Sequence, residues 1–324
     1  MLEAHLIKSL QDFNERIKRN YQDLPQADTL RDKISLFGRF IYCNKIDASR
    51  IPEFTECRPV VAVDGSRIEY ASFFPYSLVF MRTLAKCTGG SDITRSGIIS
   101  PLNLEVYNQL EKISDEQDIS LEEAYTLHLK YSLAYMELLT ALEAAKTYKP
   151  YMLMLDGGFL LFDRFEEWEE LRRVCIENKI ILTGIIEEIA TAELANWLDL
   201  NRDNRIRIYD REVLFGILEV GEYLIFNSDR RIKKDYCTVF ARLGTSPQAI
   251  GCDFLSEQED DVFKSMDFIY TLTPKSGQGI PLWLQITDAR VRIKREEAEK
   301  LVENYLDPYV KEKIFKANRK KRAF

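Results

Sequence analysis

Hydrophobic positions recur along the chain at helical spacing in several segments. Leu6, Leu10, Phe13 and Ile17 follow a 4-3-4 spacing that lines one face of a helix. Residues 1–50 are therefore expected to form an N-terminal helical arm, which packs on its own domain or on a second copy. The clearest helix is predicted from Ser120 to Tyr148, between a capping box and a closing proline. Further helices are expected at residues 162–178, 190–198 and 294–305.

Apolar runs of strand length alternate with these helices. Residues 58–64 predict a strand that ends in a Gly-Ser turn, and residues 70–80 predict its hairpin partner. Residues 151–156 form an almost wholly apolar run, which is typical of a central strand covered on both faces. Further strands are expected at residues 179–186, 222–227, 236–243, 268–273 and 279–286.

This order of elements favours one mixed α/β domain over residues 51–310, between the helical arm and a C-terminal tail at residues 311–324. Residues 86–118 are ambiguous, because their spacing fits either a strand and helix of the core or an inserted lid. No repeat or low-complexity linker divides the chain.

The composition narrows the classes of protein. The 324 residues are 46% hydrophobic and 30% charged, as in an ordinary globular protein. No apolar stretch reaches the roughly 18 residues that a membrane-spanning helix needs, and no secretory leader is evident, so a cytoplasmic protein without a membrane partner is expected. The six cysteines are scattered singly, which favours reduced thiols over a zinc site.

Histidine is too scarce to carry the chemistry. The two histidines, His5 and His128, fall in helix-like stretches and are expected to be structural or solvated. This scarcity disfavours both histidine-rich zinc sites and a catalytic triad with a histidine base. Any chemistry must rest mostly on carboxylates.

The charge is unevenly distributed. The net charge is −7, so no global positive field indicates nucleic-acid binding. From Lys311 to Phe324, however, seven residues are basic and one is acidic. Such a tail can neutralise phosphates, although a solvated terminus has the same composition.

Two aspartates follow predicted strands directly. Asp64 ends the run Val60–Val63 and Asp156 ends the run Met152–Leu155, and a glycine follows each. The edge where strands end is where α/β folds place their sites, and glycine allows close approach. The alternative for each aspartate is a turn-forming Asp-Gly pair.

A third acid is predicted on the long helix. Glu137 has mostly apolar or small neighbours three and four positions away, whereas Glu143 has Lys146 available as a surface partner. Glu137 is therefore the better candidate for a buried carboxylate, the alternative being a surface glutamate at the margin of the apolar face. A buried acid without a cation is costly unless it binds metal or stays protonated.

Together these acids predict a hard-oxygen metal site. Asp64, Glu137 and Asp156 suit Mg²⁺ or Mn²⁺, and Asp288, after another predicted strand, is a fourth candidate ligand. Such ions support phosphodiester hydrolysis without histidine, because they activate water and stabilise the leaving oxygen.

The same residues lie in motifs that resemble the NurA nuclease family, whose members have a ribonuclease-H-like fold and cut DNA with Mn²⁺ or Mg²⁺. The resemblance covers about residues 58–293. The motifs that carry it are Val61-Ala-Val-Asp-Gly-Ser66, a glutamate-bearing helix before Leu155-Asp-Gly-Gly158, Tyr209-Asp-Arg-Glu-Val-Leu-Phe215 with Gly221, and the stretch from Pro281 to Ile293.

The resemblance implies residue roles. It places the catalytic and metal-binding acids at Asp64, Glu137 and Asp156, with Asp288 where some members carry a histidine. Tyr209 is an auxiliary candidate. The sequence departs from the family at Gly158, where a serine is usual, and at Glu187 and Glu188, where members often have a basic residue or a tyrosine.

The resemblance also implies partners and activity. Family members are usually homodimers that thread DNA through a channel and act with a hexameric HerA-type ATPase. The expected activity is 5′–3′ exonuclease and endonuclease cleavage in DNA end processing and repair. Candidate DNA contacts are Arg67, Arg82, Lys320 and Lys321, the alternative for the two arginines being solvated surface residues.

Two other functions fit parts of the pattern. A non-catalytic DNA-binding or scaffold protein of the same fold would explain the departures around the acids. An actin-like phosphotransferase would use Asp64-Gly-Ser66 as its first phosphate loop, but only Asp156-Gly-Gly158 is available as the second.

Overall fold

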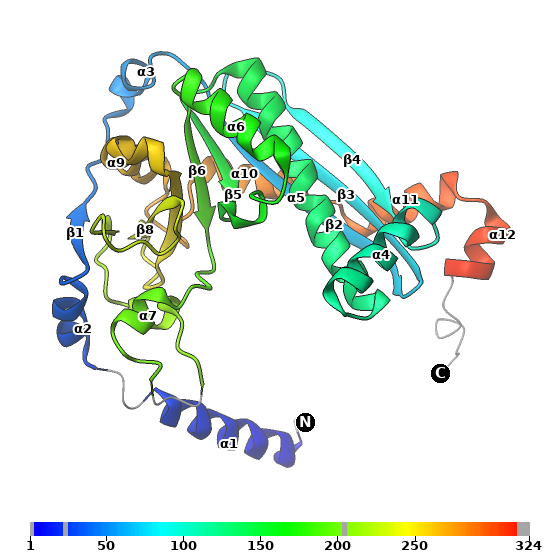
Figure 1. The fold of residues 1–324 in the computed structure, drawn as a ribbon, viewed down its shortest axis with the longest axis horizontal. Coiled ribbons are helices and arrows are strands. Elements are labelled where there is room, and N and C mark those ends of the chain that lie inside the picture. The colour runs from blue at the N-terminus through cyan, green and yellow to red at the C-terminus, as the bar shows by residue number, and fades with distance from the viewer. Residues whose placement is uncertain (1–2, 22–24, 203–205, 316–324) are drawn as a thin grey trace. The chain divides into compact units, whose positions relative to one another are not determined.

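The computed structural model describes residues 3–21, 25–202 and 206–315 (Figure 1). The chain forms two compact units. One contains the residues up to Lys45 together with Ile186–Ile280, and the other contains Ile46–Ile185 together with the residues from Pro281 onward. The candidate acids Asp64, Glu137, Asp156 and Asp288 all lie in the second of these, called the catalytic unit below.

In the described part of the catalytic unit, five strands form a mixed sheet in the order β6-β5-β2-β3-β4. Antiparallel pairing joins β2 (Val60–Phe73), β3 (Tyr76–Cys87) and β4 (Ile93–Ile99). Parallel pairing joins β2 to β5 (Met152–Asp156) and β5 to β6 (Ile181–Ile186). Three antiparallel strands followed by two parallel ones are the arrangement of a ribonuclease-H-like fold, which confirms the predicted fold class.

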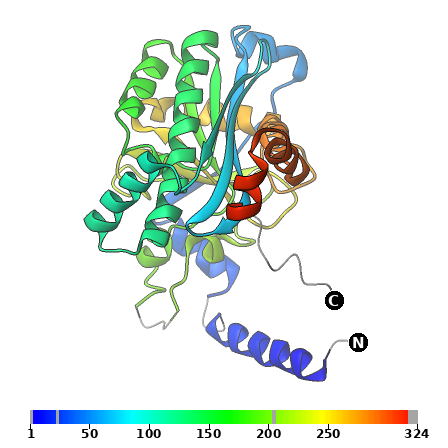
Figure 2. The same ribbon diagram turned by 90° about the vertical axis from the view of Figure 1, so that its right-hand side faces the viewer.

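Helices cover both faces of this sheet (Figure 2). Helices α4 (Leu104–Gln117) and α5 (Leu121–Tyr148) bury Val79 and Met81 of β3. On the opposite face, α11 (Arg295–Tyr305) packs on Leu78 and Phe80, and α10 (Leu282–Val291) contacts β2 and β3. Odd- and even-numbered positions of β3 thus face different helices, as the two-residue period of a strand requires.

The shorter elements of the catalytic unit complete these layers. Helix α6 (Glu166–Glu177) contacts α5 and buries Trp168. The remaining segments are a 3₁₀ turn (Ala48–Arg50), α3 (Ile51–Phe54), a second 3₁₀ turn (Phe159–Leu161), α12 (Pro308–Val310) and a π-helical turn (Lys311–Phe315).

The other unit contributes four antiparallel strands. Its strands run in the order β1 (Gly38–Tyr42), β7 (Glu222–Phe226), β8 (Tyr236–Arg242) and β9 (Ile250–Leu255). It contains a buried ion pair between Lys233 and the fully buried Asp253, and a partly buried one between Arg31 and the buried Glu222. Its helical segments are α1 (Ala4–Asn20), α2 (Ala27–Ile34), α7 (Glu193–Trp197), α8 (Asp210–Leu214), a 3₁₀ segment (Ser256–Asp261) and α9 (Val262–Leu272).

Several local predictions are confirmed. Helix α5 begins with the predicted capping box, in which Ser120 Oγ accepts from Glu123 N and the Glu123 carboxylate accepts from Ser120 N. The apolar run before Asp156 is a buried strand. Residues 86–118, which the sequence left open between two readings, contain the end of β3, strand β4 and helix α4. The cysteines are free thiols.

Two predicted strands are wrong. Residues 268–273 belong mostly to α9, and residues 279–286 lead into α10. Short apolar runs are ambiguous between strand and buried helix, and here the tertiary packing decided for helix. The first hairpin also differs, because β2 does not end at Asp64 but continues to Phe73, and the turn lies at Phe74-Pro75.

None of the helices in the described ranges combines the length and the apolar composition that crossing a membrane would require.

Candidate active site

Strand register brings the two aspartates together. In the parallel pair β2–β5, Val63 lies opposite Leu155, so the next residues, Asp64 and Asp156, follow side by side. Strand β5 ends at Asp156, while β2 continues, so Asp64 lies where β2 loses its parallel neighbour. Asp64 is only 4% exposed, whereas Asp156 is exposed at the open end of β5.

Gly65 makes room for the third acid. Glu137 projects from the middle of α5, and its Oε1 lies 2.2 Å from where a Cβ on Gly65 would be. Leu133, one turn earlier on α5, lies 2.9 Å from the same point. The glycine is therefore not a turn residue, as the sequence suggested, but the place where α5 approaches β2 most closely. No sequence signal distinguishes this role from an Asp-Gly turn.

Burial, and to a lesser extent the negative charge of neighbouring carboxylates, raises the pKa of Asp64 and of Glu137. Burial raises the pKa of Asp64 to about 8, and the negative charge of Asp156 adds to this effect. Burial likewise raises the pKa of Glu137 well above its usual value, with further contributions from Asp64 and Asp156. A group of carboxylates whose pKa values are strongly shifted, in a polar cluster at a sheet edge, is typical of a functional site.

The donor set fits a hard divalent cation. Asp64 Oδ1 accepts a hydrogen bond of 2.6 Å from Gly65 N, but its Oδ2 is buried and accepts none from the described residues. An orphaned carboxylate oxygen beside two more acids is costly unless a cation or proton satisfies it. Across the described ranges, however, no three His, Cys, Asp or Glu side chains already form a metal-binding group. Side-chain rotation would therefore have to accompany metal binding.

The prediction that Asp288, the fourth acid, follows a strand is wrong. It does not follow a strand but lies in α10, where Arg292, four residues later, holds it by bonds of 3.0 and 2.6 Å. Asp288 nevertheless contributes to the raised pKa of Asp64, so it lies near the cluster. Trp283 anchors the same helix by donating to the Lys86 carbonyl at 2.9 Å. The 288–292 spacing was the signal in the sequence that an ion pair competes for this carboxylate.

Glu143, the acid of α5 compared with Glu137 in the sequence, is a surface residue, as expected, but its partner differs. Glu143 is exposed and binds Arg95 at 2.6 Å, while Lys146 binds Glu170 instead. The strand β4 that carries Arg95 was ambiguous in the sequence, so this pairing could not be foreseen.

The candidate DNA contacts and Tyr209 lie in different settings. Arg67 is exposed on β2, and Arg82 on β3 is ion-paired with Glu297. Lys320 and Lys321 lie outside the described residues. Tyr209 belongs to the other unit, where it is exposed at the start of α8. The guanidinium carbon of Arg207 lies over its ring, 5.5 Å from the ring centroid.

The pKa of Asp64 predicts how stability depends on pH without metal. An unfolded aspartate titrates near pH 4, whereas folded Asp64 holds its proton up to about pH 8. Between these values the folded state binds more protons, so the free energy of unfolding should fall as pH rises, by at most about 4 kcal/mol from pH 5 to 8. Asp64→Asn should show a shallower fall. Denaturant unfolding in a chelator at both pH values measures this, and parallel curves for the two proteins would contradict it.

Comparisons with known structures agree with this architecture. The crystal structure of the NurA nuclease from Sulfolobus solfataricus superposes with a TM-score of 0.55 at 15% identity, over 93% of this chain and 96% of that one. Endonuclease V of Ciona intestinalis, solved with an inosine-containing 24mer DNA, matches at a TM-score of 0.37 and 13% identity, over 91% and 99% of the two chains. The C-terminal lobe of a budding yeast Argonaute matches at a TM-score of 0.38 and 10% identity, over 81% of this chain and 53% of that one. Scores below 0.5 are too low to support further conclusions.

No curated protein matches the sequence. The sequence model of the NurA domain, however, matches residues 58–293, which is most of the chain and includes all four acids of the cluster. This range agrees with the motifs that carried the resemblance in the sequence. The chain therefore belongs to the NurA domain family.

Proposed function

We propose that this protein is a DNA nuclease that hydrolyses phosphodiester bonds with Mn²⁺ or Mg²⁺, acting as a 5′–3′ exonuclease and endonuclease in DNA end processing and repair. The observation that carries the proposal is the buried, unsatisfied Oδ2 of Asp64 beside Asp156 and Glu137. Membership of the NurA domain family and the name of the Sulfolobus solfataricus nuclease support the same reaction class.

The acidic side chains of the site would have different roles, which follow from their positions. Asp64, Glu137 and Asp156 would hold the divalent ions, with Asp288 near enough to assist if it leaves Arg292. Bound ions supply charge stabilisation at the scissile phosphate and a water of lowered pKa. Buried Asp64 is the rigid member, because its strand and the Gly65 N–H fix its carboxylate, while exposed Asp156 faces the side from which substrate can arrive.

The test is degradation of linear DNA labelled at its 5′ or 3′ end, with Mn²⁺, Mg²⁺, Ca²⁺ or a chelator. Cleavage with Mn²⁺ or Mg²⁺ alone, with early loss of the 5′ label, is expected. DNA binding without cleavage under every condition would instead favour the second candidate, a DNA-binding scaffold. The ion pair between Asp288 and Arg292 is the observation that favours this second candidate, because it withholds one acid from the site.

We also propose a homodimer whose contact includes α1. The apolar seam of this helix is open, since Leu6, Leu10 and Phe13 are each more than half exposed. A 4-3-4 seam of this kind is the pattern by which helices pair. A HerA-type ATPase is the further partner that the family resemblance suggests, and co-elution of the two purified proteins tests it.

The dimer proposal predicts the effect of a single substitution. Wild-type protein should show twice the 37.8 kDa mass of one chain in light scattering, and Leu10→Lys should shift it toward the monomer. Gln11→Lys, also exposed on α1 but off the seam, is the matched control and should leave the mass unchanged. A monomeric wild type, or an unaffected Leu10→Lys dimer, would refute the seam.

A further inference from the structure

One face of the β2–β3 hairpin carries both Asp64 and an exposed aromatic pair. Asp64 lies opposite Leu84 of β3, and Tyr76, eight positions from Leu84, is on the same face because side chains alternate. Phe73 lies opposite Tyr76. Phe73 is nine positions from Asp64, and in a regular strand this odd spacing would place the two side chains on opposite faces. An irregularity between Glu69 and Ala71 adds one residue to β2, so the side chain of Phe73 lies on the same face as that of Asp64.

The two aromatic side chains, Phe73 and Tyr76, are exposed to solvent although they are large and apolar. The rings of Phe73 and Tyr76 are nearly parallel, at 9°, with their centroids 6.4 Å apart. Phe73 is 75% exposed and Tyr76 is 45% exposed. Stacked aromatic rings at a hairpin tip, with this much apolar surface facing solvent, indicate a binding surface rather than a core.

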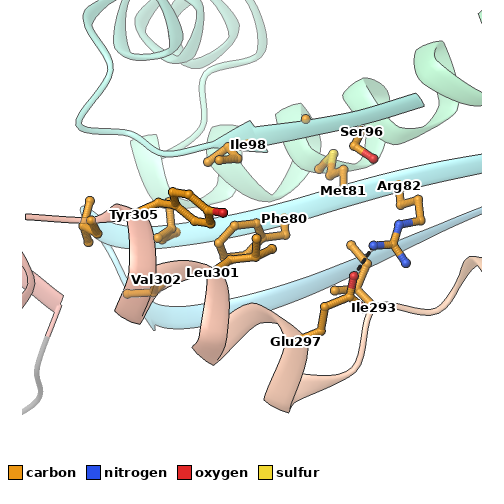
Figure 3. A pocket seen from close by; sticks show the side chains of 13 residues that line it. Phe80, Met81, Arg82, Ser96, Ile98, Ile293, Glu297, Leu301, Val302 and Tyr305 are labelled. Carbon is orange, nitrogen blue, oxygen red and sulfur yellow. Dashed lines mark hydrogen bonds and ion pairs between the residues drawn. The ribbon is translucent and has the colours of Figure 1, made fainter. Parts of the chain in front are cut away.

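An apolar groove lies on the same face, between α11 and strands β3 and β4 (Figure 3). Its volume is about 670 Å³, within the range of ligand sites. Phe80 and Ile98 line it from the strands and Tyr305 from α11, and the ion pair between Arg82 and Glu297 lies toward one end.

Along β3, the groove lies between the row of Asp64 and the row of the aromatic pair. Arg82 lies opposite Ser66, which is two residues along β2 from Asp64, so the Arg82 end of the groove is the end near Asp64. Leu78, which also lines the groove, is two residues from Tyr76 and so lies toward the aromatic pair. From the row of Asp64 to that of Tyr76 the strand spans about 27 Å.

We propose that this face is a track for an unpaired DNA strand, whose bases stack on Phe73 and Tyr76 and lie against Tyr305 in the groove. The proposal rests on the nuclease function above. Bases of a single strand have free π-faces for aromatic side chains, whereas those of a duplex are already stacked. The length would hold about eight nucleotides at B-form spacing, and fewer in an extended strand.

The charges on the track suit such a ligand. Arg82 and Glu297 neutralise each other, so the groove accepts uncharged bases without a net repulsion. The side chains of this pair are 26% and 41% exposed, so Arg82 can exchange its carboxylate partner for a phosphate as the strand passes toward Asp64.

The test compares binding of a single strand and of a blunt duplex, by fluorescence anisotropy without a cleavage-supporting metal. Phe73→Leu and Tyr305→Ala should each weaken single-strand binding roughly tenfold, with little change for the duplex. Phe73→Trp should bind like the wild type. Tyr309→Ala is the matched control, because Tyr309 is a 69% exposed tyrosine on α12 outside the groove. Tyr305 is 83% exposed, so its removal leaves the fold intact.

Two results would refute the proposal that this face binds an unpaired DNA strand. Unchanged single-strand binding in Phe73→Leu and Tyr305→Ala, or equal losses for single strand and duplex, would refute it while wild-type cleavage still upholds the nuclease function. In the first case, an apolar protein segment becomes the better occupant of the groove. Failure of the wild type to bind or cleave any DNA would refute both proposals together.

Discussion

Asp64→Asn should lower the rate of metal-dependent DNA cleavage by about 1,000-fold or more and leave DNA binding nearly unchanged. The substitution keeps the size of the side chain but removes the charge of the one buried carboxylate whose Oδ2 has no hydrogen-bond donor among the described residues. Loss of about 4 kcal/mol of transition-state stabilisation corresponds to such a factor, and a displaced divalent ion accounts for that amount. Single-turnover cleavage of end-labelled DNA measures the effect.

Folding must be separated from chemistry in this experiment. Asp64→Asn should be at least as stable as the wild type at pH 8 without metal, because it removes a carboxylate that burial disfavours. Asp115→Asn, an exposed residue of α4, is the matched control and should cleave normally. An active Asp64→Asn protein would exclude Asp64 as a metal ligand, and an inactive wild type that binds DNA would favour the scaffold function.

Gly65→Ala should lower cleavage by roughly 100-fold, because a displacement of about 1 Å at a reacting group can cost that much. The added Cβ would lie 2.2 Å from Glu137 Oε1, a separation that no real contact shows, so the carboxylate must move. The backbone at this position is an ordinary strand, which alanine adopts without strain. The loss should therefore come from the displaced acid.

A matched glycine and a rescue variant make this test specific. Gly97→Ala, also in a strand of the same sheet, meets only Met136 at 3.7 Å and should keep full activity. Combining Gly65→Ala with Glu137→Asp shortens the crowded acid and should recover part of the rate. Normal cleavage by Gly65→Ala would show that Glu137 does not need its observed position.

The parts of the candidate site that could be predicted were those encoded locally. An apolar run ending in Asp156 indicates a buried strand wherever it occurs, and the capping box at Ser120 and Glu123 sets the start of α5. From the start of α5, helical periodicity singles out Glu137 as the inward acid. These choices need only near neighbours in the chain, which is why they survive in the structure.

The errors came from features that depend on distant partners. Residues 268–273 and 279–286 are apolar runs that suit either element, and packing placed them in α9 and α10. Asp288 then acquired a helical partner, Arg292, that a strand would not have offered. Strand β9 was missed because its glycine and aspartate are poor strand formers, and pairing with β8 overrides that preference.

The sequence by itself determined the buried strand that ends at Asp156, the capped start of α5 and the amphipathic N-terminal helix, because periodicity and capping are local. Only the tertiary structure decided that Asp64 lies within a long strand, that Gly65 admits Glu137, and that one irregularity turns Phe73 toward the face of Asp64. Strand register and the approach of a helix to a sheet join residues far apart in sequence, so no local pattern records them.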